Sequence, residues 1–326
     1  MHVQCEPPLR MERPGACARP LSLYEVALAK SRLEWISPMD AVIVTHNVRD
    51  YAVRCVRALL ASTVAPSRLV LVDTGTDATA RVIEGLGEAA VVQSLSLPEN
   101  PGYGQAANAG VARTDSPFVV IANADVFPAP DTLEVLETYL IANPLVACAG
   151  AYLTNRDGSE QEAAFRFPGI AQLVLDLLPA PTLLRRSQWN GRVPTRQTPT
   201  DIDFPLGAFL AVRRATFDAV GGFDPAFYMY AEEVDLCARF REAGWRVVQV
   251  PSARVAHAGG ASTRQVPDEM LAELFLSRAR WYARHASTSK RAIALSVMVT
   301  GLGARALAPG PRRRAYRKAL AAIAHA

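Results

Sequence analysis

The chain has 326 residues, of which 50% are hydrophobic and 20% are charged, and its formal net charge is +4. This length allows one large α/β domain or two small ones, and the composition is that of a globular protein, which excludes a wholly disordered chain. Such a small net charge gives no reason to expect a nucleic-acid partner.

The five cysteines include no C-x-x-C pair and are widely spaced. This spacing argues against a disulfide framework and favours a reducing compartment, so we expect a cytoplasmic protein. Cys55, Cys148 and Cys237 lie within apolar patterns and are predicted to be small core residues.

In chain order, residues 1–39 are rich in Pro and Arg and are predicted to be a poorly ordered leader without a secretory signal. From Asp40 onward the pattern becomes regular. Continuous apolar, β-branched runs predict buried strands, and amphipathic stretches between them predict helices. The strands are expected at 41–45, 69–73, 90–93 and 118–122, and the helices at 50–60 (with Asp50 as N-cap), 76–86, 104–112 and 131–142.

The second half of the chain is more mixed. Residues 155–200 are predicted to be mostly loop with one short helix. A strand is expected at 208–213, a helix at 232–243 closed by Gly244, short strands at 246–250 and 254–256, and helices at 268–284 and 291–308. Strands separated by helices indicate an α/β fold with a mostly parallel sheet. We expect a catalytic domain at 40–265 and a helical, basic extension at 266–326.

The C-terminal extension combines an apolar stretch, 292–304, with a basic cluster at 312–318. The stretch is shorter than the roughly 20 apolar residues of a transmembrane helix, so an interfacial or packed helix fits better. The basic cluster suits an anionic surface such as phospholipid or polyprenyl phosphate, which would make the contact with a membrane peripheral. A solvated helix face is the other interpretation.

Polar residues follow three of the predicted strands, at the edge of the sheet where α/β proteins bind ligands. Thr45 and Asn47 follow the first strand, and Asp73 ends the second. A carboxylate in that position can accept hydrogen bonds from a ribose or a base, although Asp73 also fits a turn or a helix N-cap. Asn123 and Asp125 follow the fourth strand and can present oxygens to a divalent metal that bridges a diphosphate.

The segment PENPGYGQAANAG includes Gly102 and Asn108. Its glycine spacing does not match G-x-G-x-x-G, so we expect a glycine-rich turn that opens a helix crossing the site. Asn108 would lie on that helix, where a buried, hydrogen-bonded amide is the alternative interpretation.

The segment GGFDPAFYMYAEEVD places Glu232, Glu233 and Asp235 at the start of a helix, beside several aromatic residues. These carboxylates could stabilise the helix dipole, but a carboxylate beside aromatic rings also suits general-base chemistry on a sugar. Glu232 and Asp235 share a face, whereas Glu233 points about 100° away. His257 precedes two glycines, which allow a phosphate or a metal to approach closely.

Together these segments resemble glycosyltransferase family 2, the inverting enzymes with the GT-A fold, and within it the rhamnosyltransferase-like branch. The matching blocks are AVIVTHN, LVLVDTGT, ENPGYGQAANAG, VVIANADV, GAFLAVRRATFDAVGGFDPAFYMYAEEVDLCARFREAGW and RVAHAGGAST. They run in the family's order over about residues 40–264. The departures are His46 in place of Tyr, Thr74 in place of Asn, and Glu233 where Asp is common.

The resemblance implies a role for each matching residue. The donor nucleotide would be contacted by Thr45, Asn47, Asp73, Gly102, Asn108 and Asn123. A divalent metal, Mg²⁺ or Mn²⁺, would be held by Asp125 and His257. Glu233 would be the catalytic base, with Glu232 and Asp235 as supporting acids.

The resemblance also implies the reaction: one sugar passes, with inversion, from a nucleotide-diphosphate sugar to a hydroxyl of a glycan or a polyprenyl-diphosphate-linked acceptor. We expect dTDP-rhamnose or a UDP-hexose as donor, in cell-wall or polysaccharide synthesis at the inner face of the cytoplasmic membrane. The Q-x-x-R-W motif of processive synthases is absent from the sequence, which favours single-sugar transfer. The alternatives are a non-catalytic nucleotide-sugar-binding module and a sugar nucleotidylyltransferase.

Overall fold

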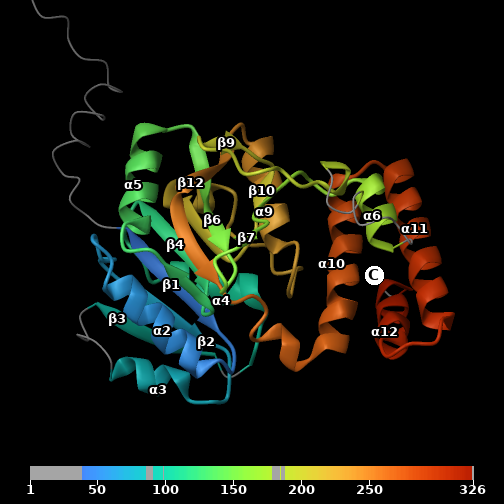
Figure 1. Cartoon of the computed structure of the whole chain (residues 1–326), viewed down its shortest axis with the longest axis horizontal. Coiled ribbons are helices and arrows are strands. Elements are labelled where there is room, and N and C mark those ends of the chain that lie inside the picture. The colour runs from blue at the N-terminus through green and yellow to red at the C-terminus, as the bar shows by residue number, and fades with distance from the viewer. Residues whose placement is uncertain (1–38, 86–90, 98, 178–183, 185–187, 325–326) are drawn as a thin grey trace, which may run out of the picture. The chain divides into compact units, whose positions relative to one another are not determined.

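A ten-stranded mixed sheet forms the centre of the computed structural model (Figure 1). The structure describes residues 39–85, 91–97, 99–177, 184 and 188–324, so the predicted leader lies outside the described residues except for Met39, which is buried. The strands run in the order β3-β2-β1-β4-β11-β6-β12-β5, with β7 beside β6 and β9 beside β12.

The four predicted N-terminal strands are present as β1 (Asp40–Thr45), β2 (Leu69–Asp73), β3 (Val92–Ser96) and β4 (Phe118–Asn123). They pair in parallel, β3 with β2, β2 with β1 and β1 with β4. The helices between them are α2 (Arg49–Leu60), α3 (Thr79–Glu84) and α4 (Tyr103–Val111). Asp50 is not the N-cap of α2, because that helix begins one residue before it and Val48 occupies the cap position.

The second half of the sheet contains strands that the sequence pattern did not reveal. These are β5 (Val126–Pro128) and β6 (Val146–Thr154), separated by the predicted helix α5 (Thr132–Ala142). The run VACAGAYLT of β6 is rich in small residues, which have weak strand propensity. At Gly150 a small residue is needed, because a Cβ there would lie 2.3 Å from Cβ of Pro205.

The expected strand at 208–213 is β11 (Phe209–Arg213), which is antiparallel to both β4 and β6. The two strands predicted on either side of Pro251 are a single strand, β12 (Arg246–His257), which pairs in parallel with β6. The register between them shifts between Val250 and Arg254, which accommodates a proline that cannot donate a ladder hydrogen bond.

Residues 155–200 contain the one expected helix, α6 (Ile170–Leu177), with several short elements around it. The short elements are β7 (Glu160–Gln161), β8 (Ala164–Phe165), the 3₁₀ turn η1 (Gln188–Asn190) and β9 (Thr200–Asp201). β8 pairs with β10 (Phe204–Pro205) in a separate two-stranded sheet.

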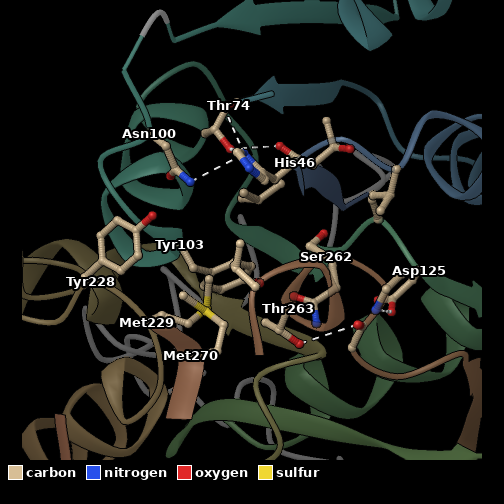
Figure 2. Close-up of a pocket in the computed structure, with 18 residues that line it drawn as sticks. His46, Thr74, Asn100, Tyr103, Asp125, Tyr228, Met229, Ser262, Thr263 and Met270 are labelled. Carbon is tan, nitrogen blue, oxygen red and sulfur yellow. Dashed lines mark hydrogen bonds between the residues drawn. The ribbon is translucent and has the colours of Figure 1, made fainter. Parts of the chain in front are cut away.

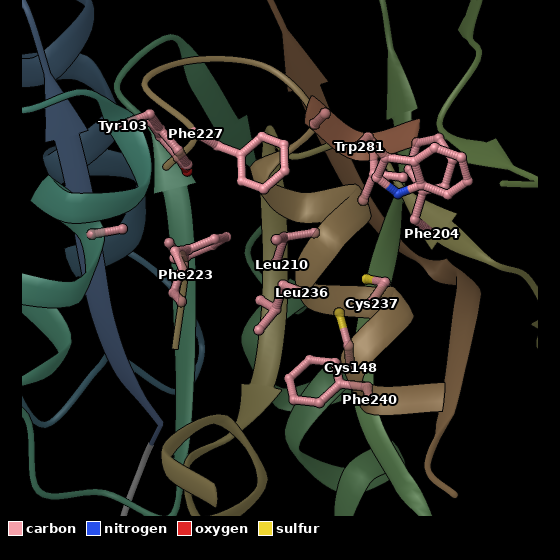
Figure 3. Packing of buried hydrophobic residues seen from close by; sticks show 14 of the residues in the cluster. Tyr103, Cys148, Phe204, Leu210, Phe223, Phe227, Leu236, Cys237, Phe240 and Trp281 are labelled. Carbon is pink, nitrogen blue, oxygen red and sulfur yellow. The ribbon is translucent and has the colours of Figure 1, made fainter. Parts of the chain in front are cut away.

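The acidic segment forms α9 (Glu232–Glu242), which follows α8 (Arg214–Ala219). Gly244, at φ +86°, ends α9 in the left-handed conformation that favours glycine, as predicted. α9 packs its apolar face into the core, where Leu236, Cys237 and Phe240 meet Cys148 of β6 (Figure 3). The predicted core cysteines Cys55, Cys148 and Cys237 are all buried and free.

The C-terminal region is helical, as expected, with the 3₁₀ turn η2 (Thr263–Gln265) leading into α10 (Pro267–His285), α11 (Thr288–Leu307) and α12 (Arg313–Ala324). α12 packs against α10 and α11, and α11 also contacts α6, so these helices lie together at one side of the sheet (Figure 1). None of the helices in the described part of the chain combines the length and hydropathy that a transmembrane span requires.

Candidate active site

A pocket opens at the carboxyl ends of β1, β2 and β4, where the sequence places its polar residues (Figure 2). It encloses about 760 Å³ of empty space, part of it open to solvent. The other walls come from the segment before α9, the loop after β12 and the first turns of α10. The polar lining residues are Thr45, His46, Thr74, Asn100, Tyr103, Asn123, Asp125, Tyr228, Ser262 and Thr263.

One end of the pocket is a neutral hydrogen-bonding group made of His46, Thr74 and Asn100 (Figure 2). Nδ1 of His46 lies 3.0 Å from the carbonyl oxygen of Thr74. Because a carbonyl only accepts, Nδ1 holds the hydrogen in the neutral ring, and Nε2 is left as an acceptor. The Thr74 hydroxyl donates to the Thr45 carbonyl at 3.0 Å.

Thr45 also lines the pocket, and its buried hydroxyl has no hydrogen-bond partner among the described residues. Buried polar groups in folded proteins are almost always paired, so this unpaired hydroxyl is an exception, and it is enclosed by the wall rather than open to the pocket.

Asn47 and Asp73, which were predicted to bind the donor, do not line this pocket but hold its rim. The side-chain oxygen of Asn47 accepts a hydrogen bond from the backbone N–H of Thr76 at 2.7 Å. The Asp73 carboxylate accepts from the N–H groups of Gly75 at 2.9 Å and Ala80 at 3.0 Å, the second of which lies in the first turn of α3. Their part in nucleotide binding stays a prediction.

Gly102 and Asn108 likewise shape the site from behind the pocket wall. Gly102 has φ +93°, and a Cβ there would lie 2.2 Å from the carbonyl oxygen of Tyr228, so only glycine lets the segment before α9 approach α4. The Asn108 amide donates to the carbonyl of Phe223 at 2.7 Å and accepts from its N–H at 2.9 Å. Both residues fasten the aromatic segment to α4, and direct contact with a donor stays a prediction.

The other end of the pocket is formed by Asn123 and Asp125, with His257 behind them. β5 and β12 pair in antiparallel register, Val126 opposite His257, and this pairing places Asp125 beside that histidine. Asp125 Oδ1 lies 3.3 Å from His257 Nε2, without the alignment of a hydrogen bond. Burial raises the pKa of the Asp125 carboxyl, but His257 and the Ala261 N–H outweigh burial, so the pKa is below its ordinary value.

The donor atoms of Asp125 and His257 fit a divalent cation. Nδ1 of His257 lies 2.8 Å from the side-chain oxygen of Gln161 in β7, which accepts a hydrogen bond from it, and this contact turns Nε2 toward Asp125. Such an outer hydrogen bond fixes the ring of a metal-binding histidine. The described residues contain no group of three or more His, Cys, Asp or Glu placed to hold a metal, so these two would need ligand oxygens to complete a site.

The start of α9 is strained. Tyr230 at φ +66° and Ala231 at φ +59° precede Glu232, and both lie in the left-handed region that residues other than glycine rarely adopt. Such strain costs about 1–3 kcal/mol per residue and clusters at functional sites. It sets the direction in which the two following glutamates leave the backbone.

Glu232 is buried and Glu233 is half-buried, and one enclosed carboxylate oxygen of each has no hydrogen-bond partner among the described residues. Burial, followed by the charges of Glu233 and Glu273, raises the pKa of Glu232 well above its ordinary value. Burial also raises the pKa of Glu233. The N–H of Gly207 stabilises the charged form and so lowers this pKa, but burial has the larger effect. Two adjacent carboxyls with raised pKa values suit proton transfer.

None of the three α9 carboxylates lines the pocket itself, but Tyr103 connects the pocket with the glutamates. Its ring lines the pocket, and its hydroxyl donates to the carbonyl of Gly207 at 3.2 Å. Burial and then the negative charges of Glu232, Glu233 and Asp125 raise the pKa of Tyr103 far above its ordinary value.

Asp235 occupies a different environment from the two glutamates. It is 0% exposed and forms an ion pair with Arg239 at 2.7 Å, and it accepts a hydrogen bond from His285 of α10 at 2.8 Å. These contacts hold α9 against α10, and a catalytic part for Asp235 stays a prediction. The pocket residues Asn100, Ser262 and Thr263 were not predicted to be functional, because loop residues leave no periodic signal in the sequence.

The comparison with protein families decides what kind of site this is. The model described as "Glycosyltransferase like family 2" matches residues 38–283, which extends from β1 through most of α10. The chain belongs to glycosyltransferase family 2. This inverting family accounts for the α/β fold, and the described site lies entirely within the matched region.

Several curated relatives of this family 2 chain are rhamnosyltransferases. The N-acetylglucosaminyl-diphospho-decaprenol L-rhamnosyltransferase of Mycobacterium tuberculosis is 29% identical over 252 residues, 72% of this chain and 80% of that protein. The rhamnosyltransferase WbbL of Escherichia coli is 34% identical over 92 residues, 28% of this chain and 35% of its own length. The O-antigen chain rhamnosyltransferase RfbN of Salmonella typhimurium is 22% identical, over 69% of this chain and 67% of that protein.

Solved structures agree on the GT-A fold. The mannosyltransferase PcManGT of Pyrobaculum calidifontis, in complex with GDP-Man and Mn²⁺, has a TM-score of 0.54 at 17% identity and covers 92% of this chain and 91% of its own. GalNAc-T7 with UDP, GalNAc and Mn²⁺ has a TM-score of 0.57 at 15% identity and covers 90% of this chain, which spans 56% of that structure.

Proposed function

We propose that this family 2 glycosyltransferase moves one rhamnose from dTDP-rhamnose to a hydroxyl of a polyprenyl-diphosphate-linked glycan, with inversion. The rhamnosyltransferase names of the relatives, one of them specific for a decaprenol-linked acceptor, support this donor and acceptor class. A UDP-hexose is the second donor to test. Because such an acceptor is embedded in a membrane, we expect the reaction at the cytoplasmic face of that membrane.

The observation that carries the proposal is Asp125, with His257 behind it, at one end of a pocket whose other end is neutral and hydrogen-bonding. The neutral end, with His46, Thr74 and Asn100, suits a nucleoside. The Asp125 end would hold Mg²⁺ or Mn²⁺ together with the donor diphosphate. When bound, the cation neutralises the charge of the leaving nucleoside diphosphate.

The acceptor chemistry falls to the first residues of α9. Glu233 would take the proton from the acceptor hydroxyl as its oxygen attacks the anomeric carbon from the face opposite the leaving group. Its raised pKa makes the Glu233 carboxylate a stronger base toward the acceptor hydroxyl than an ordinary carboxylate. Glu232 would support it, and Tyr103, with its hydroxyl held by Gly207, would keep water out between the glutamates and the pocket.

A donor panel tests the proposal. Thermal shift and calorimetry with Mn²⁺ should show the tightest binding for dTDP-rhamnose among nucleotide sugars, and product analysis with a polyprenyl-diphosphate-linked acceptor should show one added sugar. The variant Asp125→Ala should lose metal-dependent donor binding and turnover. Donor binding without turnover on any acceptor would instead indicate a binding module, and Mn²⁺-dependent binding that is unchanged in Asp125→Ala would remove Asp125 from the metal site.

A further inference from the structure

Charge is distributed very unevenly along this chain. Of the 35 Lys and Arg residues, eleven lie between Leu274 and Ala326, a segment that contains no Asp or Glu. All 31 acidic residues therefore precede Leu274, among the other 24 basic residues. A chain with a net charge of only +4 thus has a strongly basic C-terminal part and an acidic remainder, a pattern typical of proteins that approach an anionic surface.

Some of these basic side chains are neutralised within the fold, but those near the two ends of α11 are not. Arg278 pairs with Asp176, Arg280 with Glu273, and Lys318 with Glu269. Within the described residues, the exposed basic side chains that flank α11 form no ion pair with an Asp or Glu. They are Lys290, Arg291, Arg312, Arg313, Arg314 and Arg317.

The outward face of α11 is uncharged over most of its length. Its inner face packs on α6, α10 and α12 through buried small and apolar residues such as Met298 and Leu302. The opposite face exposes Ile293 at 51%, Val299 at 49% and Leu307 at 76%. Ile293 and Leu307 are separated by two intervals of seven residues and so share one stripe, which also carries the exposed side chains of Ser296 and Thr300. Val299 lies about 100° to the side of this stripe.

The apolar stripe and the flanking cations form one continuous feature. The uncharged stretch 292–304 lies between Lys290 and Arg291 on one side and Arg305 on the other, and Arg312 follows the exposed Leu307 after five residues. An exposed apolar helix face flanked by cations is the pattern of a helix that lies in the interface of an anionic bilayer, with its apolar side chains among the acyl chains. With 20 residues α11 is long enough for a span but does not reach the hydropathy of one.

We propose that the outward face of α11, flanked by the basic residues 290–291 and 312–317, docks the protein on membranes that contain anionic phospholipid. The docking surface is separate from the donor pocket, which α11 does not line. Because it needs neither donor nor acceptor, the inference goes beyond the proposed transfer reaction, and each can fail without the other.

Vesicle co-sedimentation of the full chain tests the docking surface. The protein should bind vesicles of phosphatidylcholine with about 30 mol% phosphatidylglycerol at low salt, should bind pure phosphatidylcholine much less, and should be released at about 0.5 M NaCl. The variant Arg312→Gln/Arg314→Gln/Arg317→Gln should lower the partition coefficient by about 100-fold, from roughly 1 kcal/mol per basic residue. The matched control replaces three exposed arginines elsewhere, Arg81, Arg113 and Arg156, by Gln and should bind like wild type.

The apolar stripe is tested separately. Ile293→Ser/Val299→Ser/Leu307→Ser should weaken vesicle binding by at least about tenfold, because three apolar side chains no longer leave water. Its control, Val82→Ser/Ile141→Ser/Leu145→Ser, removes exposed apolar side chains of similar accessibility far from α11 and should have no effect. An unchanged melting temperature checks that both variants fold.

Three results would overturn the proposal. The first is no binding of the wild-type chain to anionic vesicles at low salt, and the second is equal loss in the control variants. The third is a wild-type dimer in light scattering that Ile293→Ser/Val299→Ser/Leu307→Ser dissociates, while neither the wild type nor this variant binds vesicles. The stripe would then be an interface between copies of this chain.

Discussion

Replacing the three α9 carboxylates one at a time should separate catalysis from stability. Glu233→Gln keeps the size of the side chain but cannot accept a proton, so we expect kcat to fall by about 10²–10⁴-fold, the usual scale for loss of a general base. Asp235→Asn removes the charge at the centre of the contacts between α9 and α10 and should lower stability instead. Glu232→Gln should have an intermediate effect on kcat.

The magnitudes for stability follow from the contacts of each carboxylate. Asp235 is 0% exposed and pairs with Arg239 and His285, so its replacement leaves buried partners unpaired at a cost of about 3 kcal/mol. In a protein of this size that is a fall in Tm of about 6–12 °C. Glu233 has an unpaired buried oxygen, and because its pKa is raised, its ionisation destabilises the folded state as the pH rises from the ordinary carboxyl value through the raised one. Glu233→Gln should therefore leave Tm equal or higher near neutral pH, with a difference that disappears as the pH falls below the ordinary carboxyl value.

The assay combines release of the nucleoside diphosphate with thermal melting of each variant. Asp218→Asn is the matched control for Asp235→Asn, because Asp218 forms an i,i+4 pair with Arg214 in α8 but is 54% exposed. An exposed pair of this kind contributes less than about 1 kcal/mol, so its Tm should hardly change. If Asp235→Asn is inactive at an unchanged Tm while Glu233→Gln keeps near wild-type kcat, then Asp235 is the base and the assignment is wrong.

Three further outcomes are expected. The hydrogen bond with Asp235 raises the pKa of His285, although burial of the ring opposes this. The protonated ring therefore stabilises the fold fully below about pH 6.5, and this stabilisation is lost as the pH rises through the raised value. His285→Gln should lower Tm more at acidic than at alkaline pH, and an equal loss at both would contradict this. Gln161→Leu removes the partner of His257 and should weaken Mn²⁺ binding in calorimetry with nucleotide by about 10–100-fold, whereas Glu160→Leu, beside it in β7, should not. Gly102→Ala should lower Tm, because the added Cβ would collide with the Tyr228 carbonyl. Gly303→Ala, in open space on α11, should raise Tm slightly because alanine favours a helix. Similar shifts for both variants would argue against the close approach of Gly102 to Tyr228.

The sequence by itself determined the four N-terminal strands β1 to β4 and the helix with the three acids. Runs such as AVIVT and LVLVD are long, apolar and β-branched, so burial on both faces is the only arrangement that hides them from water, and β1, β2 and β4 are where the pattern predicts. The same pattern placed Thr45, Asn123 and Asp125 at strand ends, and all three line the pocket. Local periodicity suffices there because it reflects which side of an element meets the core.

Tertiary structure alone decided which of these residues meet. β5 is three residues long and β6 is rich in Ala and Gly, so neither has a strong local signal, yet the pairing of β5 with β12 brings Asp125 to His257 across more than a hundred residues. Helical periodicity separates Glu233 from the other two α9 acids but does not name their partners: α10 supplies His285 to Asp235, and the Gly207 loop meets Glu233. Electrostatic environment depends on neighbours distant in the chain, and no local pattern specifies them.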